Sequence, residues 1–156
     1  MLPDIVISDT SCFILLEKIE SIHLLKGTFS KVYTTPEVFL EFGNQLPEWV
    51  EIAEPAGDYS LTAGIIVDMG EASAIELALE FTKKGVKLFI VLDALKARRY
   101  AISEGLNVVG TMGLILMAKQ QGVISQIKPF FELIKQTNFR LNDDVEKFLL
   151  KKAGEL

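Results

Sequence analysis

Two aspartates follow short apolar runs that are typical of buried strands. Asp9 follows the β-branched run "IVIS", and Asp93 follows the continuous apolar run from Leu88 to Leu92. In a parallel sheet the carboxyl ends of the strands lie at one edge, where loops lead into helices and where ligands bind. We therefore expect both carboxylates to emerge along the same edge of a sheet.

Two glutamates on predicted helices can join these aspartates. Glu41 lies one turn after Val38 on a helix opened by Pro36, and Glu71 lies four residues before Ile75 on a later helix. This spacing directs both acids toward the apolar side of their helices. Each acid alone also has a structural explanation, because an acid near a helix start favours the helix dipole and an acid after a strand commonly caps a turn.

Taken together, the four acids indicate a metal site. Carboxylates gathered at one edge repel one another and are costly to hold ionised without a cation. Mg²⁺ or Mn²⁺ prefers oxygen ligands, retains several waters and lowers the pKa of a bound water enough to supply hydroxide near neutral pH. We therefore predict a site for phosphodiester hydrolysis whose metal ligands and catalytic residues are Asp9, Glu41, Glu71 and Asp93.

Two hydroxyl residues, Thr10 and Ser11, come directly after Asp9. One interpretation is that they orient a carboxylate or a metal-bound water beside Asp9. The other is that they form the N-cap of the following helix. The sequence leaves both interpretations open.

A cluster of cations begins the helix that follows Asp93, and its members are Lys96, Arg98 and Arg99. Arg98 and Arg99 point in different directions on a helix, so at most one of them approaches the acidic edge. Cations at this place would recruit nucleic acid and stabilise charge on the phosphate under attack. The alternative is a solubilising surface that pairs with the acidic part of the chain.

The charges of the chain are unevenly distributed. Residues 1–80 carry 14 acids and 3 bases, a balance of −11, whereas residues 81–156 carry 7 acids and 13 bases, a balance of +6. Because fields act over about 10 Å at moderate salt, the basic half can attract phosphate although the net charge is −5. This distribution permits nucleic-acid binding without requiring it.

Strands and helices alternate in the apolar pattern. The pattern predicts strands at residues 4–9, 31–35, 86–93 and 106–110, and an irregular segment around Pro47 and Pro55. It predicts helices at residues 12–27, ended by Gly27, and at 36–44, 70–85, 95–105, 111–122, 124–136 and 142–155, the last with Asn142 as N-cap. We therefore expect an α/β fold, a three-layer α/β/α sandwich with a central parallel sheet, in a single domain spanning residues 1–156.

Several other chemistries lack the residues that they need. The single cysteine, Cys12, cannot form an intramolecular disulfide, and the single histidine, His23, has no nearby nucleophile for a triad. The apolar runs are too short to span a bilayer, and a phosphate-binding glycine-rich loop is absent. We expect a cytoplasmic protein without a membrane association.

Several motifs together resemble those of a PIN domain, in the prokaryotic branch described as VapC-like. They are "IVISDTSCFILL", "TTPEVFLEF", "DMGEASAIELALE", "VLDALKARRYAISEGLNVVGTMGLILMAKQQGVI" and "FRLNDDVEKFLLKKAGE", and they cover nearly the whole chain. The resemblance implies a parallel sheet sandwiched by helices and a metal-dependent ribonuclease, with many members acting as toxins of toxin–antitoxin pairs.

The resemblance also assigns roles to single residues. It matches Asp9, Glu41 and Glu71 to the first three acids of the family, and Asp93 to the acid at the end of the later strand. Relatives in this branch usually have two adjacent acids at that point, whereas Ala94 follows Asp93 here. This departure places the second metal position in question, because losing an outer ligand weakens metal binding about 10- to 100-fold.

Two hypotheses from different classes follow. The first is a Mg²⁺- or Mn²⁺-dependent endoribonuclease that hydrolyses RNA, a toxin-type enzyme with an antitoxin protein as partner. The second is a catalytically weakened PIN-like module that binds RNA or a protein partner. The resemblance also implies a homodimer, for which the apolar helices "FILLEKIESIHLL" or "IKPFFELIKQ" could supply a self-complementary face or could instead be buried within one subunit.

Overall fold

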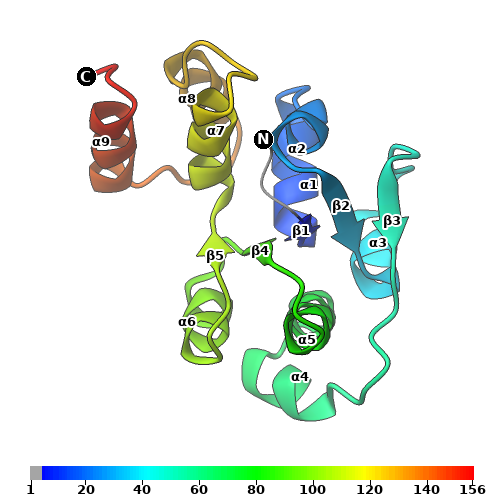
Figure 1. Cartoon of the computed structure of the whole chain (residues 1–156). Helices are drawn as coiled ribbons and strands as arrows, with labels where there is room; N and C mark the ends of the chain where they lie inside the picture. Colours follow the sequence, from blue (N-terminus) through cyan, green and yellow to red (C-terminus); the bar gives the residue numbers. More distant parts are fainter. Residues whose placement is uncertain (1–4) are drawn as a thin grey trace.

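A parallel sheet forms the centre of the protein (Figure 1), which we describe from a computed structural model covering residues 5–156. Asp4, at the start of the first predicted strand, lies outside these residues. Within residues 5–156, five strands pair in parallel in the order β3-β2-β1-β4-β5. The strands are β1 Ile5–Ser8, β2 Lys31–Thr34, β3 Val50–Ile52, β4 Leu88–Val91 and β5 Val108–Val109.

Helices cover both faces of this sheet, which confirms the predicted α/β sandwich (Figure 1). One face carries α1 Thr10–Lys18, α2 His23–Thr28, α7 Thr111–Gln120, α8 Lys128–Lys135 and α9 Asp143–Lys152. The other face carries α4 Ser60–Ile66, α5 Met69–Lys83 and α6 Leu95–Ser103. The remaining helix, α3 Pro36–Phe42, packs against both α1 and α5.

Strands β1 and β4 are buried on both faces because their apolar side chains alternate between two cores. Val6 of β1 and Val91 of β4 belong to the core under α1 and α7, whereas Ile7 and Ile90 belong to the core under α5 and α6. A strand that contributes to two cores reads as a continuous apolar run, as predicted for β1 and β4. Burial on both faces therefore holds the strand ends, and the residues that follow them, in fixed positions.

The direction in which the chain builds the sheet reverses between β1 and β4. From the central strand β1 the chain first adds β2 and β3 on one side, and then adds β4 and β5 on the other. In such sheets a ligand-binding crevice forms at this switch point, outside the carboxyl ends of the strands. Asp9 follows β1 and Asp93 comes two residues after β4, so both acids lie at this point.

The first predicted helix is wrong in its extent. Residues 12–27 do not form one helix, because the chain breaks between α1 and α2, where Glu20 adopts a left-handed φ of 54°. Gly27 does not end the segment either, since α2 continues to Thr28. A Cβ on Gly27 would lie 2.9 Å from Val123 Cγ1, so this glycine serves close packing rather than helix termination.

Two elements lie in the segment around Pro47 and Pro55, which was predicted to be irregular. Strand β3 has only three residues, of which Val50 alone is buried, so its apolar pattern is weak. Helix α4 begins without a side-chain cap bond and exposes Leu61 and Ile65, which hides its helical period. Both elements depend on neighbouring parts of the fold more than on their own sequence.

Candidate functional site at the carboxyl edge of the sheet

Asp9 is a buried carboxylate with one oxygen that lacks a hydrogen-bond partner. Its Oδ1 accepts the backbone N–H of Cys12 at 2.9 Å, which makes Asp9 the N-cap of α1. The residue is 1% exposed, and its Oδ2 makes no hydrogen bond to the described part of the protein. Burial, followed by repulsion from Asp93 and Glu71, raises the pKa of Asp9 well above its ordinary value.

Thr111 holds Asp93 at the end of the neighbouring strand. The backbone N–H of Thr111 donates to Asp93 Oδ1 at 2.8 Å, and its hydroxyl donates to Oδ2 at 2.6 Å. Thr111 begins α7 directly after β5, the strand that pairs with β4, so the sheet brings these residues together. Sequence reasoning did not single out Thr111, although a hydroxyl residue after the next strand of the sheet was a usable signal.

Glu41 extends from α3 to the same edge. The hydroxyl of Thr10 donates to Glu41 Oε1 at 3.3 Å, so Thr10 orients this carboxylate rather than that of Asp9. The carboxylate lies against Gly70, where a Cβ would overlap Glu41 Oε1. Burial, followed by repulsion from Asp68, raises the pKa of Glu41.

Glu71 and Asp68 lie together at the start of α5. Asp68 is the N-cap of this helix, and its Oδ1 accepts the backbone N–H of Glu71 at 2.8 Å. Burial and then repulsion from Asp68, Glu41 and Asp93 raise the pKa of Glu71 to about 7. Asp68 is therefore a fifth acid at the edge, and sequence reasoning missed it although an aspartate before a helical run is a common N-cap signal.

A relay of hydroxyl groups fixes the two helices that carry the glutamates. Ser73 Oγ donates to the carbonyl of Gly70 at 2.8 Å and lies 2.7 Å from Thr35 Oγ1. Because the single hydroxyl proton of Ser73 is used for Gly70, Thr35 is the donor to Ser73, and Thr35 in turn accepts the N–H of Val38 at 3.2 Å. All of these groups are buried, so the relay sets the position of α3 against α5.

The remaining predicted residues lie at different distances from this edge. Ser11 is exposed and faces a hollow that Lys18 and Asn138 also line, and the N-cap of α1 is Asp9 rather than either hydroxyl residue. Lys96 and Arg99 are exposed on α6. Arg98 is half-buried, and its Nη1 donates to the carbonyl of Leu92 at 2.9 Å.

Arg98 is thus the cation of its cluster that approaches the acidic edge. A Cβ on Gly110 would lie 2.9 Å from Arg98 Nη1 and 3.1 Å from Asp93 Oδ1. The bare Cα of Gly110 therefore leaves room for a cation and a carboxylate on the same side of β5. Arg98 and Asp93 also line a common groove of about 410 Å³, which we call the Asp93 groove.

The acids fit a hydrated divalent cation better than a cage of protein ligands. Among residues 5–156, no three histidine, cysteine, aspartate or glutamate side chains are grouped closely enough to enclose a metal ion. Mg²⁺ keeps several waters and needs only one or two carboxylates from the protein. The unpartnered Asp9 Oδ2 supplies one such oxygen, and each carboxylate oxygen of Asp93 retains a second lone pair.

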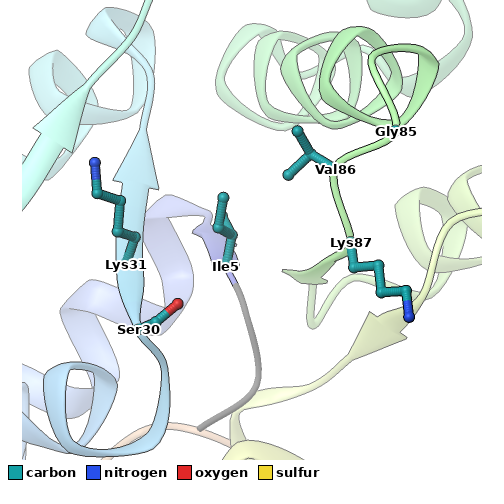
Figure 2. A pocket seen from close by; sticks show the side chains of 6 residues that line it. All are labelled: Ile5, Ser30, Lys31, Gly85, Val86 and Lys87. Carbon is teal, nitrogen blue, oxygen red and sulfur yellow. The ribbon is translucent and has the colours of Figure 1, made fainter.

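A larger hollow, of about 730 Å³, lies at the opposite end of the sheet (Figure 2). Ile5, Lys31 and Lys87, at the amino ends of their strands, are among the residues that line it. Among residues 5–156, those that line this hollow include no carboxylate and so do not supply the donors that a divalent cation requires. The acidic groups therefore distinguish the two ends of the sheet more clearly than the size of a hollow does.

The protein is thus a parallel α/β protein with acidic side chains at its topological switch point. A family model described as a PIN domain matches residues 5–155, so the chain belongs to the PIN domain family. This confirms the resemblance seen in the sequence and indicates a nuclease-type module, of a kind that typically uses divalent metal ions. Among curated proteins, no sequence matches this chain. In the described residues, no helix is long and apolar enough to cross a membrane.

Proposed function

We propose that this PIN domain is a Mg²⁺- or Mn²⁺-dependent endoribonuclease of the cytoplasm. The observation that carries the proposal is the buried Asp9 carboxylate, whose Oδ2 has no partner within residues 5–156 and which is repelled by the neighbouring acids Asp93 and Glu71. An arrangement of this kind is costly in the isolated protein and becomes favourable when a cation binds. Stability alone does not explain why such an acid is retained at the switch point of the sheet.

In this proposal each acid has a distinct role. Asp9 and Asp93 would hold the ion, which would supply neutralisation of their charge and polarisation of water and phosphate. Glu41 on α3 and Glu71 on α5, which repel each other, would orient water at the same edge. Glu71 would serve to exchange a proton with the attacking water, because it is half-buried among the acids of this edge.

Two further residues act through these acids. Thr111 fixes both oxygens of Asp93, and Thr10 fixes Glu41 from the first turn of α1. We assign them as positioning residues because neither hydroxyl carries a charge for the ion to neutralise. Arg98 lies where it can contact the scissile phosphate, while Lys96 and Arg99 add to the field that attracts RNA.

The proposal includes partners that the resemblance to toxin-type relatives implies, namely an antitoxin protein and a second copy of this chain. Helices α1 and α8 use most of their apolar side chains inside one subunit, among them Phe13, Leu16 and Phe131. Exposed apolar side chains instead gather on α4 and before α5, where Leu61 is 86% and Val67 78% exposed. We therefore place the homodimer contact on α4 rather than on either helix considered from the sequence, and light scattering on purified Leu61→Asp protein tests this choice.

The decisive experiment is cleavage of a mixed single-stranded RNA pool by purified protein. We expect cleavage with Mg²⁺ or Mn²⁺, none with a chelator, and loss of cleavage in Asp9→Asn. Asp58→Asn is the matched control, because Asp58 is exposed and its carboxylate accepts from Ser60 away from the edge. Full activity in a folded Asp9→Asn protein would contradict the proposal.

A specific observation favours a second candidate function, a non-catalytic PIN module that binds RNA or a protein partner. Ala94 is the N-cap of α6, has no side-chain cap bond, and occupies the position where relatives usually have a second acid. The two candidates differ in their response to metal. Calorimetric titration with Mg²⁺ or Mn²⁺ showing saturable binding that Asp9→Asn abolishes supports the enzyme, and absence of binding supports the non-catalytic module.

A further inference from the structure

We propose that the Asp93 groove binds one nucleotide of single-stranded RNA beside the scissile phosphate, with its base against Phe148 and its phosphate near Arg98 and Arg140. This inference rests on the proposed function, since it assigns the substrate contacts next to the acidic edge. The groove begins at Asp93 and continues between β5 and α9. A ligand in it is therefore continuous with the acids at the switch point.

The apolar wall of the groove comes mainly from α9. Val145, Phe148 and Leu149 of this helix line one side, and Val108 and Val109 of β5 line the other. Phe148 is 63% exposed, although a phenylalanine ring is normally placed in a core. An exposed aromatic ring beside a polar site is suited to stacking against a base, and such stacking is tolerant of base identity.

The charges around this wall suit a nucleotide. Arg98 and Arg140 line the groove, and among residues 5–156 Asp93 is the single carboxylate that lines it. Lys152 Nζ lies 5.7 Å from the centre of the Phe148 ring, which adds a third cation next to the aromatic wall. Asp143 and Asp144, in the first turn of α9, are exposed and do not line the groove.

The size of the groove sets the size of the occupant. Its volume of about 410 Å³ lies near the lower end of the roughly 300–1,000 Å³ typical of small-ligand sites. This range favours a single nucleotide over a helical or extended protein segment, which needs a longer channel. The aromatic face suits a base, the two arginines suit a phosphate, and the adjoining acidic edge suits the reacting centre. These three features follow one another along the groove.

The test measures RNA binding separately from cleavage. All variants are made in the Asp9→Asn protein, and fluorescence anisotropy follows binding of a short labelled RNA and of copies with an abasic site at each position in turn. We expect Phe148→Ala to weaken binding of the intact RNA about 10-fold. We also expect that an abasic site at one position weakens RNA binding to the otherwise unchanged protein by the same factor. The same abasic site should not weaken binding further in Phe148→Ala.

Two further variants separate the base contact from general effects. Ile102→Ala is the matched control, because Ile102 is 57% exposed on α6 and does not line the groove, and it should bind RNA normally. Arg140→Ala should weaken binding of intact and abasic RNA equally. It should also reduce the slope of the logarithm of affinity against the logarithm of salt concentration by about one. Circular dichroism of each variant verifies that α9 remains folded.

The outcomes distinguish this proposal from the proposed function. If Phe148→Ala binds every probe as well as Ile102→Ala does, the groove does not hold a base and the inference is overturned. A loss confined to Arg140→Ala overturns it too, since only a phosphate would then be bound. If wild-type protein fails to cleave RNA while Phe148→Ala still weakens RNA binding, the nucleotide site is supported and the proposed nuclease activity is rejected.

Discussion

Two regions of this protein hold low-exposure carboxylates in opposite ways. At the acidic edge, Asp9 Oδ2 has no partner among residues 5–156, and nearby acids raise the pKa of Asp9 and Glu71. In the second region Glu155, with a side chain 8% exposed, accepts from Lys119 Nζ at 2.9 Å and from the backbone N–H groups of Ile127 at 2.8 Å and Lys128 at 2.9 Å. We call this second group the Glu155 clamp.

The difference lies in whether the fold itself supplies a partner for the charge. Burial alone would raise the pKa of Glu155, but the hydrogen bonds from Ile127 and Lys119 outweigh it and the pKa is lowered. At Asp9 the backbone hydrogen bond from Cys12 also lowers the pKa, but burial and repulsion from Asp93 outweigh it and the pKa is raised. The fold thus supplies partners for both oxygens of Glu155, whereas one oxygen of Asp9 has no partner among the described residues.

The largest expected effect concerns the Glu155 clamp. Glu155→Gln removes the charge that Lys119 faces and presents an amide donor toward a site built from donors, so the free energy of unfolding should fall by about 2 kcal/mol. Chemical denaturation at neutral pH measures this change. Glu132→Gln is the control, because the Glu132–Lys135 pair is exposed and should contribute less than about 0.5 kcal/mol. Equal stability of the two variants would remove the contrast between the regions.

Replacing a carboxylate by an amide at the acidic edge should raise the free energy of unfolding instead of lowering it. In metal-free protein Asp9→Asn removes repulsion from Asp93 and Glu71 while its amide oxygen still accepts from Cys12, so the free energy of unfolding should rise by about 1 kcal/mol. Denaturation in a chelator measures the rise. Adding Mg²⁺ should stabilise wild type and leave Asp9→Asn unchanged. A destabilised Asp9→Asn protein in chelator would show that Asp9 is structural.

The pH dependence of stability offers a finer comparison. The pKa of Glu71 rises from 4.5 to about 7 on folding, so between these values the folded protein binds more protons than the unfolded chain. The contribution of Glu71 is therefore most favourable below about pH 4.5, declines as pH rises, and is lost above about pH 7. Denaturation of metal-free wild type and Glu71→Gln across this range measures the difference. If the difference does not grow with pH, Glu71 is not held near repelling acids.

The smallest effect is expected at Ala94. Its φ of −69° and ψ of 128° suit an N-cap, so Ala94→Asp should cap α6 and increase the free energy of unfolding by about 0.5–1 kcal/mol with Mg²⁺ present. Added charge next to Asp93 should reduce this gain in a chelator. Calorimetry should show tighter Mg²⁺ binding than in wild type, by up to about 10-fold. Unchanged Mg²⁺ affinity would place the ion away from position 94.

The sequence was sufficient to predict the elements that carry strong local patterns. The apolar runs of β1 and β4 are buried on both faces, so their pattern and the acids after them could be read directly. Helix α9 has a side-chain N-cap in Asn142, and the predicted cap is confirmed. The break at Glu20 and the short strand β3 could not be predicted, since tertiary packing rather than local preference fixes them.

The acids themselves were easier to predict than the groups that orient them. Periodicity and strand ends place Asp9, Glu41, Glu71 and Asp93 at one edge, and the structure brings their elements there. The role of Thr111 depends on which strands are neighbours, which a single sequence does not show, whereas Asp68 carries an N-cap signal that does not by itself indicate a place at the acidic edge. Their roles at the site, like those of the four predicted acids, stay proposals that the experiments above test.

The hydroxyl relay from Thr35 through Ser73 to Gly70 has a consequence for how this protein tolerates changes in length. Glu41 fits only over the bare Cα of Gly70, and Ser73 meets Thr35 three residues further along α5. These two contacts set the register of α3 against α5 independently of the long connection that joins them. Insertions or deletions in the exposed parts of that connection outside β3 and α4 can therefore be absorbed while the two glutamates keep their spacing, which makes those parts a natural place to graft a tag.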